Sequence, residues 1–120
     1  MSNKRSRLGQ KGEDLAADHI CRQDYRILER NYRCKIGEID IIALYEEYLI
    51  FVEVKTRAPG KMEVDPLLSM TAAKINRLRK LGEYYRVVNR LEALQPRFDF
   101  VGIVYRTETD FSLNHIENAF

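Results

Sequence analysis

The stretch that decides the fold is residues 37–57, with the sequence GEIDIIALYEEYLIFVEVKTR. Two runs within it, residues 38–45 and 48–57, are rich in Ile, Val, Phe and Tyr and predict two β-strands. Glu46 and Glu47 separate the runs, and a two-residue turn at these positions would make the strands an antiparallel hairpin. Neither turn residue is Gly or Asn, so a longer loop or a bulge that shifts the pairing stays open as an alternative.

With the two-residue turn, Asp40 lies opposite Glu53, and Glu38 lies opposite Lys55. Side chains directly opposed in a hairpin are about 5 Å apart, where two carboxylates repel each other unless a cation lies between them. Magnesium is commonly held by one or two carboxylates, with water and phosphate oxygens as its other ligands. Because strand residues alternate faces, Lys55 shares the face of Glu53, where its ammonium can orient a water or stabilise charge on a phosphoryl oxygen. The spacing therefore predicts a metal-assisted site that hydrolyses an anionic ester.

An alternative interpretation is that Glu53 and Lys55 form a solvated ion pair on an exposed strand. Residues 49–52, directly before them, have the sequence LIFV without polar alternation, which is typical of a strand buried on both faces. Charged groups on such a strand are costly unless they are paired or bind a metal ion. The neighbouring residues therefore favour a site over a solvated pair.

The rest of the chain predicts further elements around this hairpin. Apolar residues recur with a helical period over residues 9–22, and again from Ser69 or Thr71 to Leu91. Strands are predicted at residues 25–33, 97–105 and 112–117, and a loop at residues 58–69. The order α-β-β-β-α-β-β predicts one α/β domain over residues 1–120, with a central mixed β-sheet flanked by helices and a last strand at the sheet edge.

Two segments are expected to be flexible. Residues 1–8 form a basic N-terminus. The loop at residues 58–69 contains two prolines and a glycine and directly follows Glu53 and Lys55. We therefore expect this loop to be mobile and to border the site.

The charges of the chain are segregated. The 120 residues carry 20 Lys and Arg against 18 Asp and Glu, which gives a net charge of only +2. Residues 1–11 and 74–97 carry +4 and +5, whereas residues 38–53 and 107–120 carry −5 and −3. An acidic centre between basic segments is compatible with a metal site flanked by surfaces that bind a polyanion, although solvated basic helix faces give the same pattern.

Several classes of protein are excluded. No apolar run reaches the roughly 20 residues of a membrane-spanning helix, and no apolar segment typical of a secretory signal follows the basic N-terminus. Cys21 and Cys34 are too few for a disulfide framework, and His19 and His115 lack partners at zinc-ligand spacing. We therefore expect a cytoplasmic protein with reduced thiols, without membrane association and without a structural zinc ion.

Glu13 is a further candidate, because it lies on the apolar side of the first predicted helix, three and four residues before Ala16 and Ala17. An acid in the first turn of a helix is also stabilised by the helix dipole. Its position therefore has a structural explanation as well as a functional one.

The pattern of Asp40 followed by Glu53-Val54-Lys55 resembles the D…(D/E)xK signature of the restriction-endonuclease-like, or PD-(D/E)xK, nuclease superfamily. More closely, the chain resembles the YraN family of small bacterial proteins, whose role is poorly defined. The resemblance covers residues 9–120. The blocks that carry it are GQKGE at residues 9–13, NYR at 31–33, GEID at 37–40, FVEVKTR at 51–57, Lys74, RFD at 97–99 and HIENAF at 115–120. The chain departs from the pattern at two positions. It has Ile39 where many superfamily members have Pro, and Asp24 where the family usually has Gly.

The resemblance implies a restriction-endonuclease-like fold, similar to that of archaeal Holliday-junction resolvases. It implies that Asp40 and Glu53 bind Mg²⁺ (or Mn²⁺), with the Val54 carbonyl as a further metal ligand. It also implies that Lys55 is the catalytic lysine and that Glu13 is the helix-borne catalytic acid of the resolvases.

Nucleic-acid contacts are expected from four basic residues, Lys11, Arg57, Lys74 and Arg77. For Lys74, the resemblance implies the role of an accessory basic group on the long helix. For Arg57, an ion pair with Glu63 or Asp65 remains the alternative to a phosphate contact.

Three functions fit these observations. The first is a metal-dependent endonuclease that hydrolyses phosphodiester bonds in DNA, with branched or Holliday-junction DNA as the candidate substrate and RNA as the less favoured alternative. The second is a non-catalytic nucleic-acid-binding module of the same fold. The third is a protein–protein module whose long helix presents Arg77, Arg79 and Lys80 to an acidic partner. A homodimer is expected only by analogy with the junction resolvases.

Overall fold

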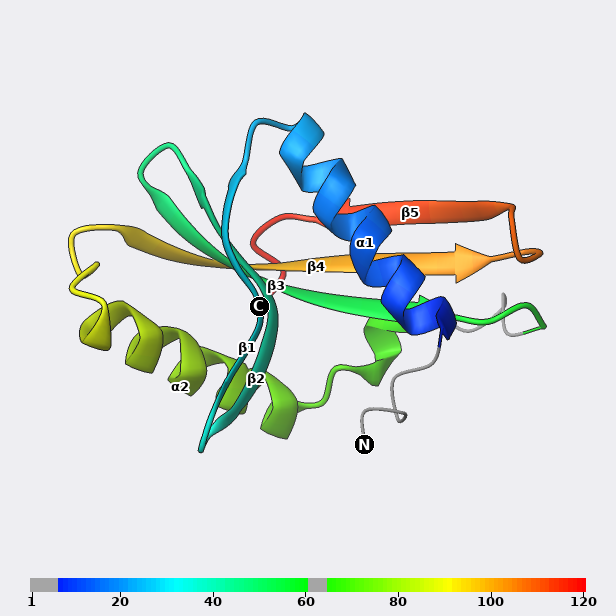
Figure 1. Ribbon diagram of the computed structural model, residues 1–120. Helices are drawn as coiled ribbons and strands as arrows, with labels where there is room; N and C mark the ends of the chain where they lie inside the picture. The colour runs from blue at the N-terminus through cyan, green and yellow to red at the C-terminus, as the bar shows by residue number, and fades with distance from the viewer. Residues whose placement is uncertain (1–6, 61–64) are drawn as a thin grey trace.

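Figure 1 shows the computed structural model, which describes residues 7–60 and 65–120. Within these ranges the five strands form one sheet in the order β1-β2-β3-β4-β5, and α1 and α2 lie on opposite sides of it. The predicted order of helices and strands is confirmed, with one additional 3₁₀ helix, η2. The elements are α1 (Arg7–Arg22), β1 (Arg26–Cys34), β2 (Gly37–Tyr45), β3 (Tyr48–Arg57), η2 (Pro66–Ser69), α2 (Ala72–Val88), β4 (Gln95–Tyr105) and β5 (Phe111–Ile116).

The β2–β3 hairpin has the predicted register. Tyr45 pairs with Tyr48 across a two-residue turn, and the ladder continues to Ile41 opposite Val52. Glu46 has a φ of 53°, the left-handed conformation that such a tight turn requires. The alternative of a longer loop is therefore wrong, and the ladder ends one step before Asp40 and Glu53.

The sheet is mixed, as predicted. β3 and β4 pair in parallel, from Tyr48 opposite Gln95 to Arg57 opposite Val104, and α2 lies between them in the chain. β5 pairs antiparallel with β4 from Phe100 onward and forms one edge of the sheet.

Two apolar cores cover the two faces of the sheet. Residues 49–52 of β3 are fully buried, and successive side chains alternate between the two cores. The α1 core includes Ile20, Ile50, Val52 and Val101, and the α2 core includes Leu49, Phe51, Leu81 and Phe98. The prediction of a strand buried on both faces is confirmed.

The long helix begins as predicted but ends earlier. Thr71 is its N-cap, and the Thr71 hydroxyl accepts a hydrogen bond of 3.2 Å from the Lys74 N–H. The helix ends at Val88 instead of Leu91, because Arg90 adopts a left-handed φ of 58° and the Asn89 side chain donates to the Tyr85 carbonyl.

The fourth strand begins at Gln95 instead of Arg97. Pro96 lies inside it, opposite Leu49 of β3. Because β5 pairs with β4 only from Phe100 onward, β4 has an open side at Pro96, where a residue without an N–H is tolerated.

The two segments expected to be flexible are described only in part. Arg7 and Leu8 belong to α1, so the expected flexible N-terminus does not extend to residue 8, and residues 1–6 lie outside the described residues. In the predicted loop, residues 61–64 also lie outside them, so its mobility stays a prediction. Pro66–Ser69 form η2, which begins where the Asp65 side chain accepts the Leu67 N–H at 3.0 Å.

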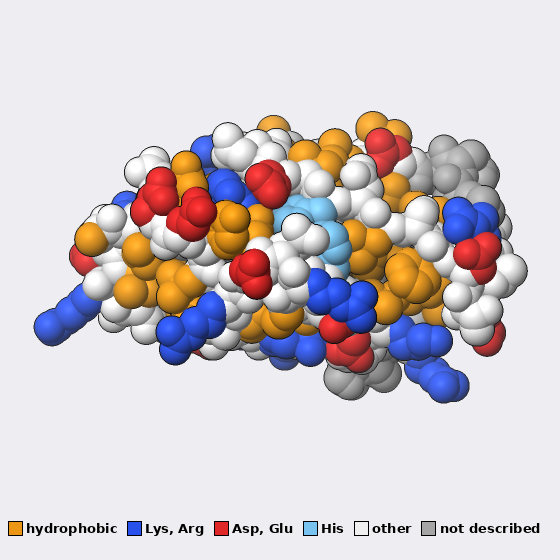
Figure 2. Space-filling view, turned by 90° about the horizontal axis from the view of Figure 1, so that it is seen from above, with side chains coloured by type: hydrophobic (Ala, Val, Ile, Leu, Met, Phe, Trp, Pro, Cys, Tyr) orange, Lys and Arg blue, Asp and Glu red, His pale blue; other side chains and the backbone are white. Residues whose placement is uncertain are grey.

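The surface formed by α1 and β5 carries interspersed charges (Figure 2). Exposed ion pairs contribute to this mixture, including Arg22–Asp18 on α1 and Arg106–Asp110 beyond β4. Both of these pairs join residues four apart in the sequence, so they neutralise charge locally and do not join the oppositely charged segments. Among the residues that the structure describes, no helix is both long and apolar enough to cross a membrane.

Gly82 lets α2 approach the sheet closely. A Cβ added at this position would lie 2.9 Å from the Phe98 ring and 3.0 Å from the Phe51 ring. These two rings stack on each other in the α2 core and cannot move aside as a flexible side chain would. A glycine that is unfavourable for an isolated helix is thus required by packing.

We predict that Gly82→Ala lowers the free energy of unfolding by about 1–2 kcal/mol, because overpacking outweighs the gain of about 1 kcal/mol in helix propensity. Urea denaturation measures this change. Asn76→Ala, at an exposed position of the same helix, is the matched control and should not destabilise the protein. A Gly82→Ala variant as stable as the control would contradict the packing argument.

Candidate metal and nucleic-acid site

The candidate site lies where β2 separates from β3. The last backbone pair between them is Ile41–Val52, whereas β3 stays paired with β4 as far as Arg57. At this point one carboxylate oxygen of Asp40 accepts a hydrogen bond of 2.8 Å from the Val54 N–H. The Asp40 side chain thus takes the place of a strand partner and is held beside the Glu53–Val54 peptide.

Glu53 and Lys55 lie on the α2 face of β3. With Glu38, Lys74 and Arg77 they line a hollow of about 200 Å³, the α2-side hollow, between the open end of the hairpin and α2. One acid of β2, Glu38, thus lines the same hollow as Glu53 and Lys55, and two basic residues of α2 complete the wall.

Glu53 has a strongly perturbed acidity. Burial of the carboxyl group, followed by the nearby negative charge of Asp40, raises the pKa of Glu53 to about 7. Lys55 and Lys74 lower this pKa, but by less than the first two effects raise it. The charge of one carboxylate makes ionisation of the other less favourable. A cation bound between the two would therefore be stabilised.

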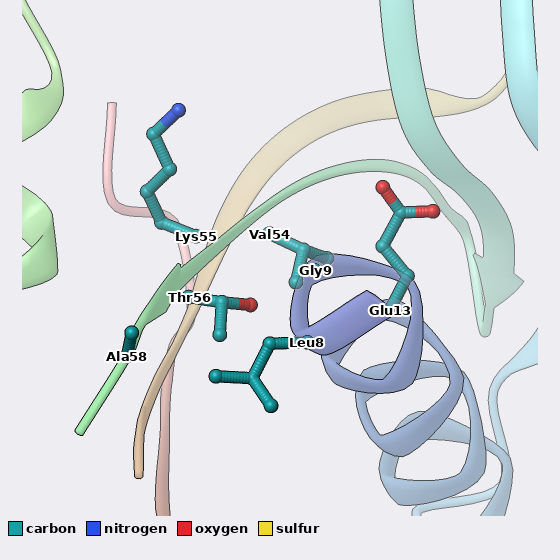
Figure 3. Close-up of a pocket in the computed structure, with 7 residues that line it drawn as sticks. All are labelled: Leu8, Gly9, Glu13, Val54, Lys55, Thr56 and Ala58. Atoms are coloured by element: carbon teal, nitrogen blue, oxygen red, sulfur yellow. The ribbon is translucent and has the colours of Figure 1, made fainter. Parts of the chain in front are cut away.

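Glu13 lies on the other face of β3. It is 5% exposed and lines a second hollow of about 230 Å³, the α1-side hollow, with Lys55, Thr56 and other residues of α1 and β3. Figure 3 shows Val54 between Glu13 and Lys55. Lys55 borders both hollows, whereas Glu13 and Glu53 line different ones.

The position of Glu13 within α1 corrects one expectation. The helix begins at Arg7, so Glu13 is not in the first turn, where the helix dipole would stabilise an acid. Gly12 brings this part of α1 close to β3, because a Cβ there would overlap the Thr56 hydroxyl. Close packing on the sheet, and not the dipole, accounts for the burial of Glu13.

The four predicted nucleic-acid contacts differ in location. Lys74 is half-buried and donates to the Ser69 carbonyl at 3.1 Å, and Arg77 is exposed at the rim of the α2-side hollow. Lys11 is exposed on α1 and lines neither hollow.

The Nε of Arg57 is buried and has no hydrogen-bond partner among the described residues. None of the ion pairs among these residues joins Arg57 to Asp65. The other alternative partner, Glu63, lies outside the described residues.

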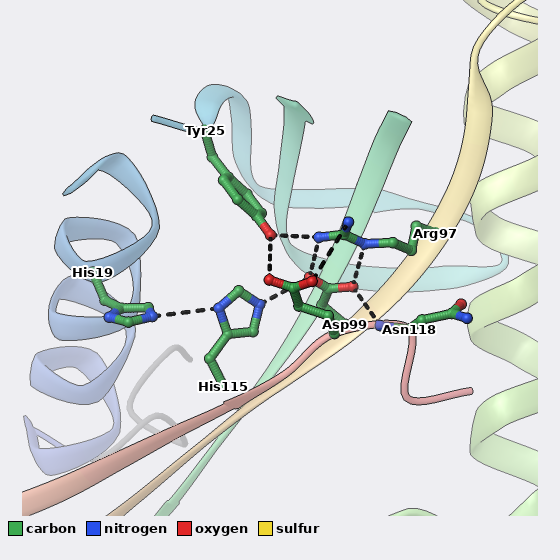
Figure 4. Close-up of polar contacts among 7 residues, drawn as sticks. His19, Tyr25, Arg97, Asp99, His115 and Asn118 are labelled. Carbon is green, nitrogen blue, oxygen red and sulfur yellow. Dashed lines mark hydrogen bonds and ion pairs between the residues drawn. The ribbon is translucent and has the colours of Figure 1, made fainter. Parts of the chain in front are cut away.

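A second polar cluster, which the spacing of the sequence does not predict, surrounds Asp99 of β4 (Figure 4). Asp99 is completely buried and accepts two hydrogen bonds of 2.9 Å from Arg97, one of 2.8 Å with His115 and one of 3.0 Å from the Asn118 N–H. Arg97 also donates to the Tyr25 hydroxyl. The cluster joins β4, β5 and the residues that follow β5.

The acidity of Asp99 reflects these contacts. Burial alone would raise the pKa of Asp99, but the hydrogen bonds from His115, Arg97 and Asn118 outweigh it and leave the pKa below its ordinary value. Two sequence signals pointed to these residues: the alternation of Arg97 and Asp99, which places both side chains on one face of a strand, and the RFD and HIENAF blocks of the family resemblance.

The fold and the site define a small α/β domain with a candidate metal site at the open end of a β-hairpin. The chain belongs to UPF0102, an uncharacterised protein family whose model matches residues 12–103. This confirms the resemblance to the YraN family, which is the same group.

Relatives match over almost their whole length. The chain is 39% identical to a UPF0102 protein of Caldanaerobacter subterraneus, covering 98% of this chain and 97% of the relative. It is 40% identical to one of Syntrophotalea carbinolica (100% and 96% covered) and 41% identical to one of Thermodesulfovibrio yellowstonii (97% of each).

We predict that Glu53→Gln is more stable than the wild-type chain at pH 8 but not at pH 5, with EDTA present. The pKa of Glu53 is about 7 in the folded chain, above its ordinary value of 4.5, so folding becomes less favourable as pH rises between these values. Urea midpoints at the two pH values measure the difference. Equal midpoints for variant and wild type at pH 8 would show that Glu53 is not perturbed.

Asp99→Asn should destabilise the chain by about 3–5 kcal/mol, because it leaves the buried Arg97 charge without its carboxylate. Since the pKa of Asp99 is lowered, the stabilisation is present above about pH 4, the ordinary pKa of Asp, and is lost as pH falls through the folded value. Thermal and urea unfolding measure both effects. The control Asp110→Asn removes an exposed pair with Arg106 and should have little effect; similar losses in both variants would contradict the role given to burial.

Proposed function

We propose that this protein is a metal-dependent endonuclease that hydrolyses phosphodiester bonds in DNA, with branched DNA such as a Holliday junction as its candidate substrate. The observation that carries the proposal is the group Asp40, Glu53 and Lys55 at the open end of the hairpin, beside two basic residues of α2. Its resemblance to the D…(D/E)xK signature of the nuclease superfamily supports the same function.

The donor atoms suit Mg²⁺ or Mn²⁺. Within residues 7–60 and 65–120, no three His, Cys, Asp or Glu side chains converge on one point as metal ligands. Magnesium does not require three, because one or two carboxylates with water and substrate phosphate usually hold it. Asp40 and Glu53 would supply the carboxylates, and the Val54 carbonyl is the proposed further ligand. The ion would polarise the phosphate and make a water more acidic.

The side chains of the chain have distinct roles in this proposal. The Val54 N–H holds the Asp40 carboxylate in place, so little ordering is needed when substrate binds. Lys55 places a positive charge beside Glu53, where it stabilises negative charge that develops on the phosphoryl oxygens. Lys74 and Arg77 bind the DNA backbone next to the scissile bond, and Glu13 acts from the α1-side hollow, on the other face of β3.

Cleavage tests the proposal directly. We expect the purified chain to cleave at least one member of a panel of linear, flapped and four-way-junction DNAs with Mg²⁺ or Mn²⁺, and not with EDTA. Lys55→Ala should lower the rate about 100-fold, comparable to the loss of one group that stabilises charge in a transition state. Asp40→Asn should abolish metal-dependent cleavage while its amide oxygen can still accept the Val54 N–H.

Lys80→Ala, at an exposed position of α2 outside the hollow, is the matched control and should cleave at the wild-type rate. The catalytic proposal fails if no substrate is cleaved, or if cleavage survives unchanged in Asp40→Asn and Lys55→Ala. Tight, salt-sensitive binding without cleavage would assign the chain to the alternative class, a non-catalytic nucleic-acid-binding module.

Salt dependence tests the proposed phosphate contacts. The logarithm of the DNA-binding constant should fall linearly with the logarithm of salt concentration, and Lys74→Ala or Arg77→Ala should each reduce the slope by about 1. Fluorescence anisotropy at several salt concentrations measures these slopes. If the salt dependence of DNA binding is as steep in Lys74→Ala and in Arg77→Ala as in the control Lys80→Ala, α2 is not part of the DNA-binding surface.

A further inference from the structure

The fold brings the two histidines of the chain together, although they are far apart in sequence. His19 lies near the end of α1 and His115 near the end of β5, and Nε2 of His19 is 3.3 Å from Nδ1 of His115. The ring planes are inclined at 80°, with centroids 5.3 Å apart (Figure 4). This pair belongs to the cluster around Asp99 and takes no part in the proposed nuclease site.

We propose that His19 and His115 are the protein ligands of a binding site for a divalent transition metal, with Zn²⁺ as its representative. A tetrahedral zinc ion about 2.0–2.1 Å from each of two imidazole nitrogens separates those nitrogens by about 3.3 Å. The observed separation of the two facing nitrogens therefore matches that of a liganded pair. Imidazole nitrogen is a ligand that Zn²⁺, Cu²⁺ and Ni²⁺ prefer, whereas Mg²⁺ prefers oxygen.

Asp99 prepares His115 for this role. An ionised carboxylate only accepts hydrogen bonds, so at the 2.8 Å contact Nε2 of His115 is the donor to Asp99. In neutral His115 the lone pair is then on Nδ1, the atom that faces His19. A carboxylate on the second nitrogen is the usual outer partner of a metal-bound histidine, and Arg97 holds this carboxylate in turn.

His19 can become a ligand without net loss of a proton. Without metal, Nε2 of neutral His19 donates its hydrogen to Nδ1 of His115. Moving that hydrogen to Nδ1 of His19 leaves a lone pair on Nε2, so both facing nitrogens can bind one ion. The ring of His115 keeps its hydrogen bond to Asp99 throughout.

A tetrahedral ion on the two histidines would need two further ligands. No third His, Cys, Asp or Glu ligand joins the pair in the described part of the chain. His19 is half-buried, and histidine reaches the surface between α1 and β5 in Figure 2. The His115 side chain is 8% exposed, so an ion would reach the pair from the His19 side, with water or a donor from another molecule completing its coordination.

Nuclear magnetic resonance of the imidazole nitrogens tests the site, because the chain has only two histidines to assign. With ¹⁵N-histidine label and Zn²⁺ added to the full chain, we expect Nε2 of His19 and Nδ1 of His115 to shift together and to saturate near one equivalent. His19→Gln, at the more accessible position, should weaken Zn²⁺ binding at least tenfold in competition with a chromophoric chelator. Asp18→Asn, at the exposed neighbouring acid, should bind as the wild type does.

The site is refuted if neither histidine, or only one, responds to one equivalent of Zn²⁺. It is also refuted if the paired shifts disappear in Cys21→Ser, since the exposed thiol would then be a required ligand. Asp40→Asn should retain the paired shifts, so failure of the histidine site and failure of the nuclease site are distinguishable.

Discussion

The structure depends on the separation of β2 from β3 at Asp40. Up to Ile41 and Val52 the two strands exchange backbone hydrogen bonds, and beyond that pair the Asp40 side chain accepts the next available N–H, that of Val54. One carboxylate therefore ends a ladder and is positioned beside Glu53. A buried strand end left without this acceptor would carry an unsatisfied donor, which costs about 1–3 kcal/mol.

The two helices convert this opening into two hollows. α1 reaches β3 because Gly12 leaves room for Thr56, and α2 reaches it because Gly82 leaves room for Phe51 and Phe98. Lys55 lies at the border of both hollows, with acidic groups on either side. The same close packing that builds two cores thus collects charged groups from α1, β2, β3 and α2 around the end of one strand.

Local patterns predict most of this arrangement. The hairpin register follows from apolar runs and a two-residue turn, so Asp40, Glu53 and Lys55 could be placed together from sequence. The start of α1 could not, because Arg7 lies in a polar segment without an apolar pattern, and the predicted helix therefore began two residues too late, at residue 9. The cluster of His19, Asp99 and His115 depends on the β4–β5 register and on how α1 packs, which no local pattern contains.

The most direct measurement of the central claim is paramagnetic broadening of backbone amide signals by Mn²⁺, which locates a bound ion without requiring a substrate. The account predicts that substoichiometric Mn²⁺ first broadens the amides of Asp40, Glu53, Val54 and Lys55, and that Asp40→Asn with Glu53→Gln removes the effect. Broadening that begins elsewhere in the chain, or that persists in the double variant, would contradict a metal site at the open end of the hairpin.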